Sequence, residues 1–301
     1  MINNHDIITK MRVLESFSVL YRSFAISQQS LENIKDILLN NPKEALKFFL
    51  TYAYGGRQGV PKWFLLIAIH CIEDVYEQND ELAELEEEIQ TRFLEYHGSA
   101  NPSRNPLFST SSRSSAISAF NFNDIWNHLQ NGEVSTAYNS LIGINGIGPK
   151  IAAYFLRDVV DFFGIDISNW KEENFYNFYY LQPIDIWIKT VAHELSLQVS
   201  DSEIPSNMEA GERDHRPYIV GICNTCLSNN INPLRFNQGS WFFASMICGT
   251  PSVLTHILHN FSPQQIIERA LSFKIVYTTL NWQEFEEQVR KIIQEIGAVS
   301  Q

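Results

Sequence analysis

The sequence predicts a mainly α-helical fold, and three observations support this prediction. Apolar residues recur every three or four positions through most of the chain, which is the period of an amphipathic helix. No segment shows the regular apolar–polar alternation of a half-buried strand, and no internal repeat is found. A hydrophobic content of 45% with 19% charged residues is typical of a globular protein with a substantial core.

The expected helices follow from local signals along the chain. Met11, Leu14 and Phe17 lie close to helical spacing. Pro61 suits the first turn of a helix, and the acidic residues 79–97 are strong helix formers. We expect helices over residues 11–25, 42–54, 62–77, 79–97, 123–130 (capped by Asn123-Asp124), 134–142, from 149, 186–199, 217–228, 236–247, and from 263 with a break near Leu280. We expect polar loops at 101–115 and 200–216.

A glycine-rich segment, residues 141–157 (LIGINGIGPKIAAYFLR), contains the most informative pattern. Its glycines are expected to permit a turn too tight for Cβ atoms, and Pro149 and Lys150 then begin a new helix. Two helices joined in this way expose consecutive backbone N–H groups at a helix N-terminus, which can bind an anion. The residues assigned to this turn are Gly143, Asn145, Gly146 and Gly148.

Two motifs resemble those of a known superfamily. Gly146-Ile147-Gly148-Pro149-Lys150, followed by two alanines, resembles the helix-hairpin-helix of DNA repair glycosylases. Pro183-Ile184-Asp185 resembles the Pro-Val-Asp element of the same superfamily, in which the aspartate starts the next helix. The bifunctional members, of the 8-oxoguanine glycosylase and endonuclease III types, carry a lysine at the position of Lys150. The match spans about residues 135–200, and the extra length between Lys150 and Asp185 lies in the aromatic residues 169–180.

The resemblance implies a two-lobed helical glycosylase fold and an activity. One lobe, residues 40–165, would carry the hairpin, and the other, residues 1–39 plus 166–301, would carry the catalytic aspartate. The implied activity is base-excision DNA glycosylase, which removes a damaged base from double-stranded DNA, with Schiff-base AP lyase activity. Because lysine-bearing relatives remove oxidised bases, 8-oxoguanine is the leading substrate. The hairpin would hold a phosphate, with a monovalent cation as in family members.

The residue types at the two motifs suit this chemistry. Base excision builds positive charge on the sugar, which a carboxylate such as Asp185 stabilises, and a free amine such as Lys150 can trap C1′ as a Schiff base. The first turn of a helix disfavours an ammonium group. The alternatives are that Lys150 contacts a DNA phosphate or solvent, and that Asp185 is only the N-cap of the following helix.

Three further residues are weaker candidates for the base pocket. Trp187 follows the aspartate by two positions and would face either the cleft or the core. Phe236 and Gln238 belong to a C-terminal segment that helps to line the base pocket in the related enzymes. Amides within this apolar segment can instead bridge other polar groups, because buried amides need partners.

The net charge of −12 opposes nucleic-acid binding, because contacts to phosphates usually supply much of the affinity. Residues 73–95 hold ten acidic residues and one base, Arg92, and are expected to form a solvated helix face. Two alternative functions remain. One is a non-enzymatic helix-hairpin-helix DNA-binding protein, and the other is an N-glycosidase that acts on a nucleoside or an unusual modified base.

The four cysteines do not form a disulfide framework for a chain of this size. Cys223 and Cys226 form a C-x-x-C pair, but no second pair or nearby histidines complete a zinc or iron–sulfur site. We therefore expect no bound metal or cluster and place these cysteines in the core. The N-terminus does not resemble a signal peptide and the apolar runs are too short for a bilayer, so we expect a cytoplasmic monomer without a membrane partner.

Overall fold

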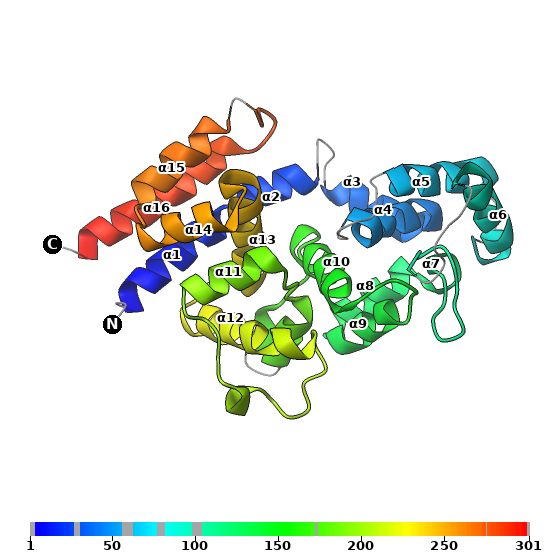
Figure 1. Ribbon diagram of the computed structural model, residues 1–301, viewed down its shortest axis with the longest axis horizontal. Helices are drawn as coiled ribbons and strands as arrows, with labels where there is room; N and C mark the ends of the chain where they lie inside the picture. The colour runs from blue at the N-terminus through cyan, green and yellow to red at the C-terminus, as the bar shows by residue number, and fades with distance from the viewer. Residues whose placement is uncertain are drawn as a thin grey trace. The chain divides into compact units, whose positions relative to one another are not determined.

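The computed structural model describes residues 4–26, 31–55, 63–76, 82–97, 104–171, 174–274 and 276–299. These residues form helices joined by turns (Figure 1), and none of them lies in a β-strand, so the mainly α-helical prediction is confirmed. The chain divides into a central unit, residues 30–180, and a terminal unit, residues 1–29 with 181–301. The lobe expected from the sequence, residues 40–165, is shorter at both ends than this central unit.

Aromatic rings build the core of the central unit. Phe155 packs against Phe49, Tyr52 and Phe120, with ring centroids 5.2, 5.3 and 5.8 Å away. These contacts join α10 (Pro149–Phe162) to α4 (Pro42–Gly55) and to the segment that follows α7 (Ala116–Ala119). The elements of this unit are α3 (Leu31–Asn40), α4 (Pro42–Gly55), α5 (Trp63–Val75), η1 (Leu82–Leu85), α6 (Glu86–His97), α7 (Ala116–Ala119), α8 (Phe122–Gln130), α9 (Val134–Ile142), α10 (Pro149–Phe162), η2 (Ser168–Lys171) and η3 (Phe175–Leu181).

The acidic segment of the central unit is mostly solvated, as expected from its sequence. Helix α6 buries only Ile89 and Phe93 among its residues. Glu73, on α5, pairs with Lys43 and Lys47 of α4. The acidic residues of α6 therefore contribute charge to the surface of this unit, while its apolar residues provide the contact with the core.

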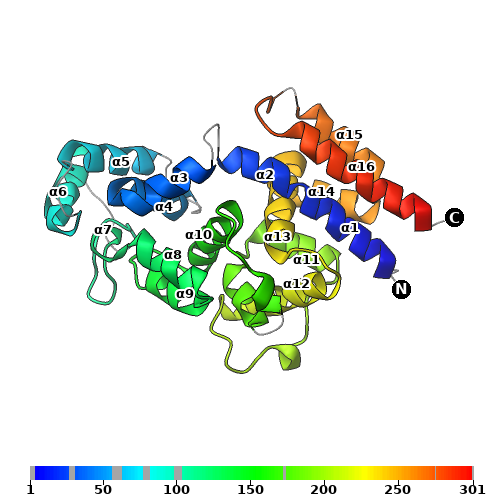
Figure 2. The same cartoon turned by 180° about the vertical axis from the view of Figure 1, so that it is seen from behind.

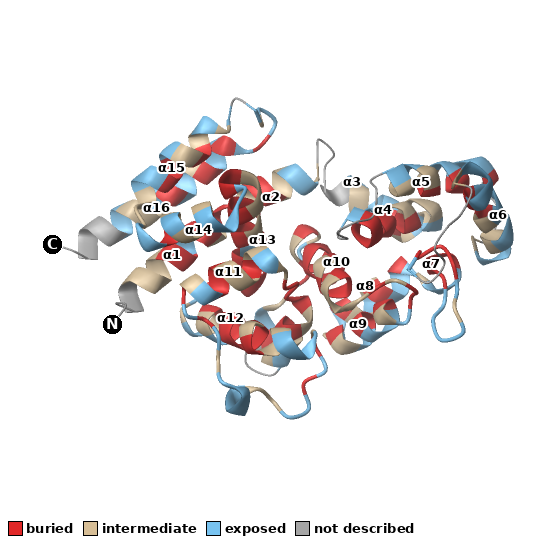
Figure 3. Ribbon diagram, in the orientation of Figure 1, coloured by how far each residue is buried: buried red, intermediate tan, exposed pale blue. Residues whose placement is uncertain are grey.

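In the terminal unit, α13 (Pro233–Phe242) lies among several other helices. It packs against α1, α2, α11 and α12, and Figure 3 shows it buried along most of its length. Helices α1 and α16 also pack together, as the view from behind shows (Figure 2). The elements are α1 (Asn4–Ser16), α2 (Ser18–Ala25), α11 (Ile186–Glu194), η4 (Asp201–Glu203), η5 (Arg213–His215), α12 (Arg216–Ser228), α13 (Pro233–Phe242), the π-helix η6 (Phe243–Cys248), α14 (Pro251–His259), α15 (Pro263–Ser272) and α16 (Trp282–Val299).

Gly239 lets α13 approach the N-terminal helices at backbone distance. A Cβ atom at this position would lie 2.0 Å from the carbonyl oxygen of Leu14 and 2.9 Å from the backbone nitrogen of Ser18. The single helix predicted for residues 11–25 is wrong at this point, because α1 ends at Ser16 and α2 begins at Ser18. The break at Phe17 therefore coincides with the place where α13 crosses.

Several helix limits also differ from the prediction. The cap of α8 is Asn121, whose side chain accepts from two backbone N–H groups, so the expected Asn123-Asp124 cap is wrong. The short helices α3, α7 and α14 were not predicted, whereas the break near Leu280 is confirmed. Pro61 and residues 101–103 lie outside the described residues.

Within the described ranges, no single helix is long and apolar enough to cross a membrane. Two consecutive helical segments, 233–248 and 251–259, reach that length and apolar character only when they are taken together, and the chain bends by 111° between them.

We predict that Gly239→Ala lowers the free energy of unfolding by about 1–3 kcal/mol or more, because the added Cβ forces apart helices that touch through backbone atoms. Gly55→Ala is the matched control, since a Cβ at that helical position meets nothing within 4 Å. Chemical denaturation of both variants measures the difference. Equal stability of the two variants would contradict the close approach at Gly239.

Candidate active site

The turn between α9 and α10 depends on one glycine in particular. Gly146 has a φ of +73°, a left-handed conformation that residues with a Cβ rarely adopt. Gly148 is extended, with φ −106° and ψ 175°, and a Cβ there would meet nothing within 4 Å. Gly143 is in the right-handed helical region. The expectation that the turn is too tight for a Cβ at all three glycines is therefore wrong for Gly148.

Most backbone N–H groups of this turn are already used within the chain. Ile144, Asn145 and Ile147 each donate to a backbone carbonyl oxygen, at 3.0, 2.7 and 3.1 Å. The expected run of consecutive exposed N–H groups is therefore wrong. In the part of the chain that the structure describes, the N–H of Gly148 has no hydrogen-bond partner. It lies directly before α10, where the helix dipole favours an anion.

Asn145 fixes the turn to the preceding loop. Its side chain is 3% exposed, and Nδ2 donates to the carbonyl oxygens of Asn105 and Phe108, at 3.1 and 2.9 Å. The backbone of Ser114 forms a bridge with the turn through two hydrogen bonds, from its N–H to Gly143 and from Asn145 to its carbonyl. Asn145 therefore supports the turn structurally through its side chain.

Arg113 places a cation beside this turn, which the sequence analysis missed. Its Nη1 donates to the carbonyl oxygen of Ile147 at 3.1 Å, and the residue is exposed. Arg113 lies in the serine-rich loop, so no local pattern in the sequence connects it with the glycine turn. A guanidinium has further donors available for a phosphate.

Lys150 lies in the first turn of α10, one residue after Pro149, and is partly exposed. Further along the same helix, Arg157 and Asp158 form a buried ion pair, with Nη2 and Oδ1 2.8 Å apart. The guanidinium of Arg157 also lies over the ring of Tyr154, 4.9 Å from its centroid. These contacts lie within α10, which packs into the central unit through Phe155, and Lys150 lies at its start.

Asp185 is the N-cap of α11, as the sequence predicted. Its Oδ1 accepts hydrogen bonds from the backbone N–H groups of Trp187 and Ile188, at 3.0 and 3.1 Å. Its Oδ2 accepts from the indole Nε1 of Trp241 at 3.1 Å. Both carboxylate oxygens are therefore held, and Trp241 is a second residue that the sequence analysis missed.

Residues of α13 hold the chain just before Asp185. The Nδ2 of Asn237, which is fully buried, donates to Oε1 of Gln182 at 3.1 Å and to the carbonyl oxygen of Pro183 at 3.3 Å. Asn237 therefore bridges other polar groups, which is the alternative role expected for the amides of this segment. Phe236 and Gln238 are 0% exposed, which does not favour a role in contacting a base. Trp187 is partly exposed.

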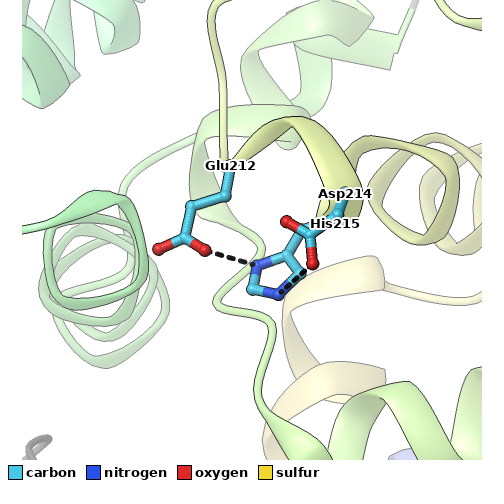
Figure 4. Close-up of side chains that lie close together, drawn as sticks. All are labelled: Glu212, Asp214 and His215. Carbon is cyan, nitrogen blue, oxygen red and sulfur yellow. Dashed lines mark ion pairs between the residues drawn. The ribbon is translucent and has the colours of Figure 1, made fainter.

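A second polar cluster lies in the same unit, at the start of α12. Figure 4 shows His215 between the carboxylates of Glu212 and Asp214, with nitrogen–oxygen distances of 3.9 and 3.6 Å. Among the described residues, these three form a group with ligand atoms close enough for a metal ion. Lys189 Nζ lies 3.0 Å from Oδ2 of Asp214. The chain therefore supplies a cation to this cluster itself, and ion pairing is a sufficient role for it.

Burial lowers the pKa of His215, and the nearby Lys189 ammonium lowers this pKa further. The carboxylates of Asp214, Glu212 and Asp185 act in the opposite direction. The imidazole is therefore held in its neutral form at a lower pH than a free histidine. This is the shift expected when desolvation exceeds the attraction of neighbouring carboxylates.

Cys223 and Cys226 lie in the core, as predicted. Both are on α12 and are fully buried, and burial raises the pKa of both thiols well above the usual value. Since the thiolate is the reactive and metal-binding form of cysteine, these positions favour packing over chemistry.

We predict that His215 makes the protein less stable as the pH falls. Because the pKa of His215 is lower in the folded state, the unfolded chain binds the proton first below about pH 6.5. The free energy of unfolding should therefore fall from pH 7.5 to 5.5, and His215→Gln should reduce this fall. Urea denaturation across this range measures it. Lys189→Gln should also reduce the fall, and identical slopes in all three proteins would contradict the prediction.

The chain matches no protein-family model, no curated protein and no solved structure.

Proposed function

We propose that this chain is a base-excision DNA glycosylase of the helix-hairpin-helix superfamily with AP lyase activity. Its substrate would be double-stranded DNA that contains a damaged base, with oxidised bases such as 8-oxoguanine as the leading class. The observation that carries the proposal is the geometry of Asp185. A carboxylate that caps a helix and is held at both oxygens suits the stabilisation of positive charge on a sugar.

In the proposed reaction, Lys150 and Asp185 have separate roles. The free amine of Lys150 attacks C1′ of the nucleotide, and the base leaves with the electrons of the glycosidic bond. The carboxylate of Asp185 stabilises the positive charge that develops on the sugar before the new C–N bond is complete. The attached nitrogen then loses a proton to solvent, and O4′ takes up a proton as the C1′–O4′ bond breaks, which leaves an iminium ion between C1′ and the lysine nitrogen. Loss of a proton from C2′ allows the C3′–O bond to break, which is the lyase step.

The turn before α10 is the proposed phosphate site. The N–H of Gly148 and the guanidinium of Arg113 are both donors that suit an anionic oxygen. This arrangement needs no basic run in the sequence, so it is compatible with a net charge of −12. A monovalent cation at the turn remains part of the proposal by resemblance alone.

The most informative experiment is a panel of duplexes, each with one damaged base, assayed for strand cleavage with and without alkali. We predict that borohydride traps the wild-type protein covalently on its substrate duplex, because a Schiff base is reduced to a stable amine. Lys150→Gln should abolish trapping and retain part of the duplex affinity. Continued trapping in this variant would assign the nucleophile to another amine.

Asp185→Asn tests the second catalytic role in the same assay. Loss of the charge should slow base release by about 10²-fold or more, which corresponds to about 2.7 kcal/mol or more in the barrier. Because Asn is also a good N-cap, the helix itself should form. Full activity of Asp185→Asn would reduce Asp185 to a helix cap, and the proposed mechanism would fail with it.

We predict that Gly148→Val weakens duplex binding without unfolding the protein. The new side chain fits an extended backbone and points into open space, where it would obstruct a phosphate. Arg113→Gln should also weaken binding and reduce the salt slope of the affinity by about 1. Arg92→Gln, on the acidic helix α6, is the control and should change neither. Unchanged affinity in both test variants would remove this turn from the DNA interface.

Two other functions are separated by the same measurements. A non-enzymatic DNA-binding protein would bind the duplexes and show neither cleavage nor trapping. An N-glycosidase for a nucleoside or an unusual modified base would show no steep dependence of duplex binding on salt. The second alternative suits the acidic charge of the chain.

A further inference from the structure

Helix α13 presents two hydrogen-bond donors on one face to the segment that ends at Asp185. Asn237 and Trp241 are four residues apart, so their side chains lie on the same side of the helix. The first donates to the residues before Asp185 and the second to the carboxylate itself. The segment and the side chain are therefore held by one rigid element at two successive points.

The indole of Trp241 is itself held in place. Its ring meets the ring of Tyr21 edge to face, with centroids 5.9 Å apart at 83°, and Tyr21 is 1% exposed. An indole nitrogen is a donor only, so its partner at this position must be an acceptor. Because Oδ1 of Asp185 is occupied by two backbone N–H groups, the Trp241 bond to Oδ2 fixes the rotation of the carboxylate plane.

We propose that Trp241 is a positioning residue for the Asp185 carboxylate. This inference rests on the proposed function for its catalytic consequence, while the bond itself can be tested without any activity. Trp241 acts through Asp185, since its indole N–H orients the carboxylate that stabilises the sugar cation. Loss of that N–H lets the carboxylate turn about the Cβ–Cγ bond.

The bond also predicts an unusual behaviour of Asp185→Asn. To cap α11, the new side chain must direct its amide oxygen at the N–H groups of residues 187 and 188. Its NH₂ group then faces the indole N–H of Trp241, and two donors oppose each other. Asp185→Asn should therefore destabilise the protein beyond the loss of charge, and Trp241→Phe should relieve this part of the destabilisation.

A double-mutant cycle on the full chain tests the bond. Asp185→Asn lowers the folding equilibrium constant by some factor in the wild type, and this factor should be roughly tenfold smaller in the Trp241→Phe background. The difference corresponds to about 1.4 kcal/mol of coupling. Trp282→Phe is the matched control, because Trp282 also donates through its indole nitrogen, to the carbonyl oxygen of Tyr277 at 2.7 Å. In that background Asp185→Asn should cost as much as in the wild type. Additive effects of Asp185→Asn and Trp241→Phe would overturn the proposal.

The catalytic consequence is tested by single-turnover base release on the lesion duplex. Trp241→Phe should slow base release about tenfold at saturating protein without changing the duplex affinity, and Trp282→Phe should change neither. If the stability effects of Asp185→Asn and Trp241→Phe are coupled but Trp241→Phe releases base at the wild-type rate, the positioning role is overturned. If the wild-type protein releases no base although the cycle is coupled, the proposed function fails and the Trp241–Asp185 bond stands.

Discussion

The burial of α13 on nearly all sides is the constraint on which the terminal unit depends. A helix contacted by α1, α2, α11 and α12 buries most of its residues, with Arg235 exposed, and buried polar groups favour positions that offer partners. Gly239 lacks a side chain where the backbone of α1 approaches. Asn237 and Trp241 have partners, and these partners are the residues at and before Asp185. The core packing and the orientation of the candidate catalytic carboxylate therefore have the same origin.

In the central unit, the groups that lie next to the turn before α10 differ in character from the acidic surface of α6. The acidic residues of α6 give this unit a negative surface, but charges separated by more than about 10 Å are largely screened at moderate salt. At the turn before α10 the near groups are donors, namely the Gly148 N–H and the Arg113 guanidinium. An anion bound there would contact these donors directly, whereas Glu86 of α6, which reaches the same loop, is already hydrogen-bonded to Ser109 at 3.1 Å. Net charge is therefore a poor guide to this particular site.

The features that the sequence predicted well are those with local causes. The N-cap of α11 requires only Asp185 and the N–H groups of Trp187 and Ile188, and the left-handed turn residue requires only Gly146. Arg113 and Trp241 are brought to these positions by contacts between segments distant in the chain, which periodicity and capping rules do not describe. The break at Phe17 has the same explanation, since it coincides with the crossing of α13.

The hydrogen bonds of Asp185 also limit the chemistry that it can perform. An ionised carboxylate has about four acceptor positions, and three are occupied by the N–H groups of Trp187, Ile188 and Trp241. A general base must turn toward a water and take its proton, which requires a free and mobile oxygen. A carboxylate held by three donors is better suited to act as a fixed negative charge. This geometry therefore favours an electrostatic role for Asp185 and leaves bond formation to another group, which is the role proposed for Lys150.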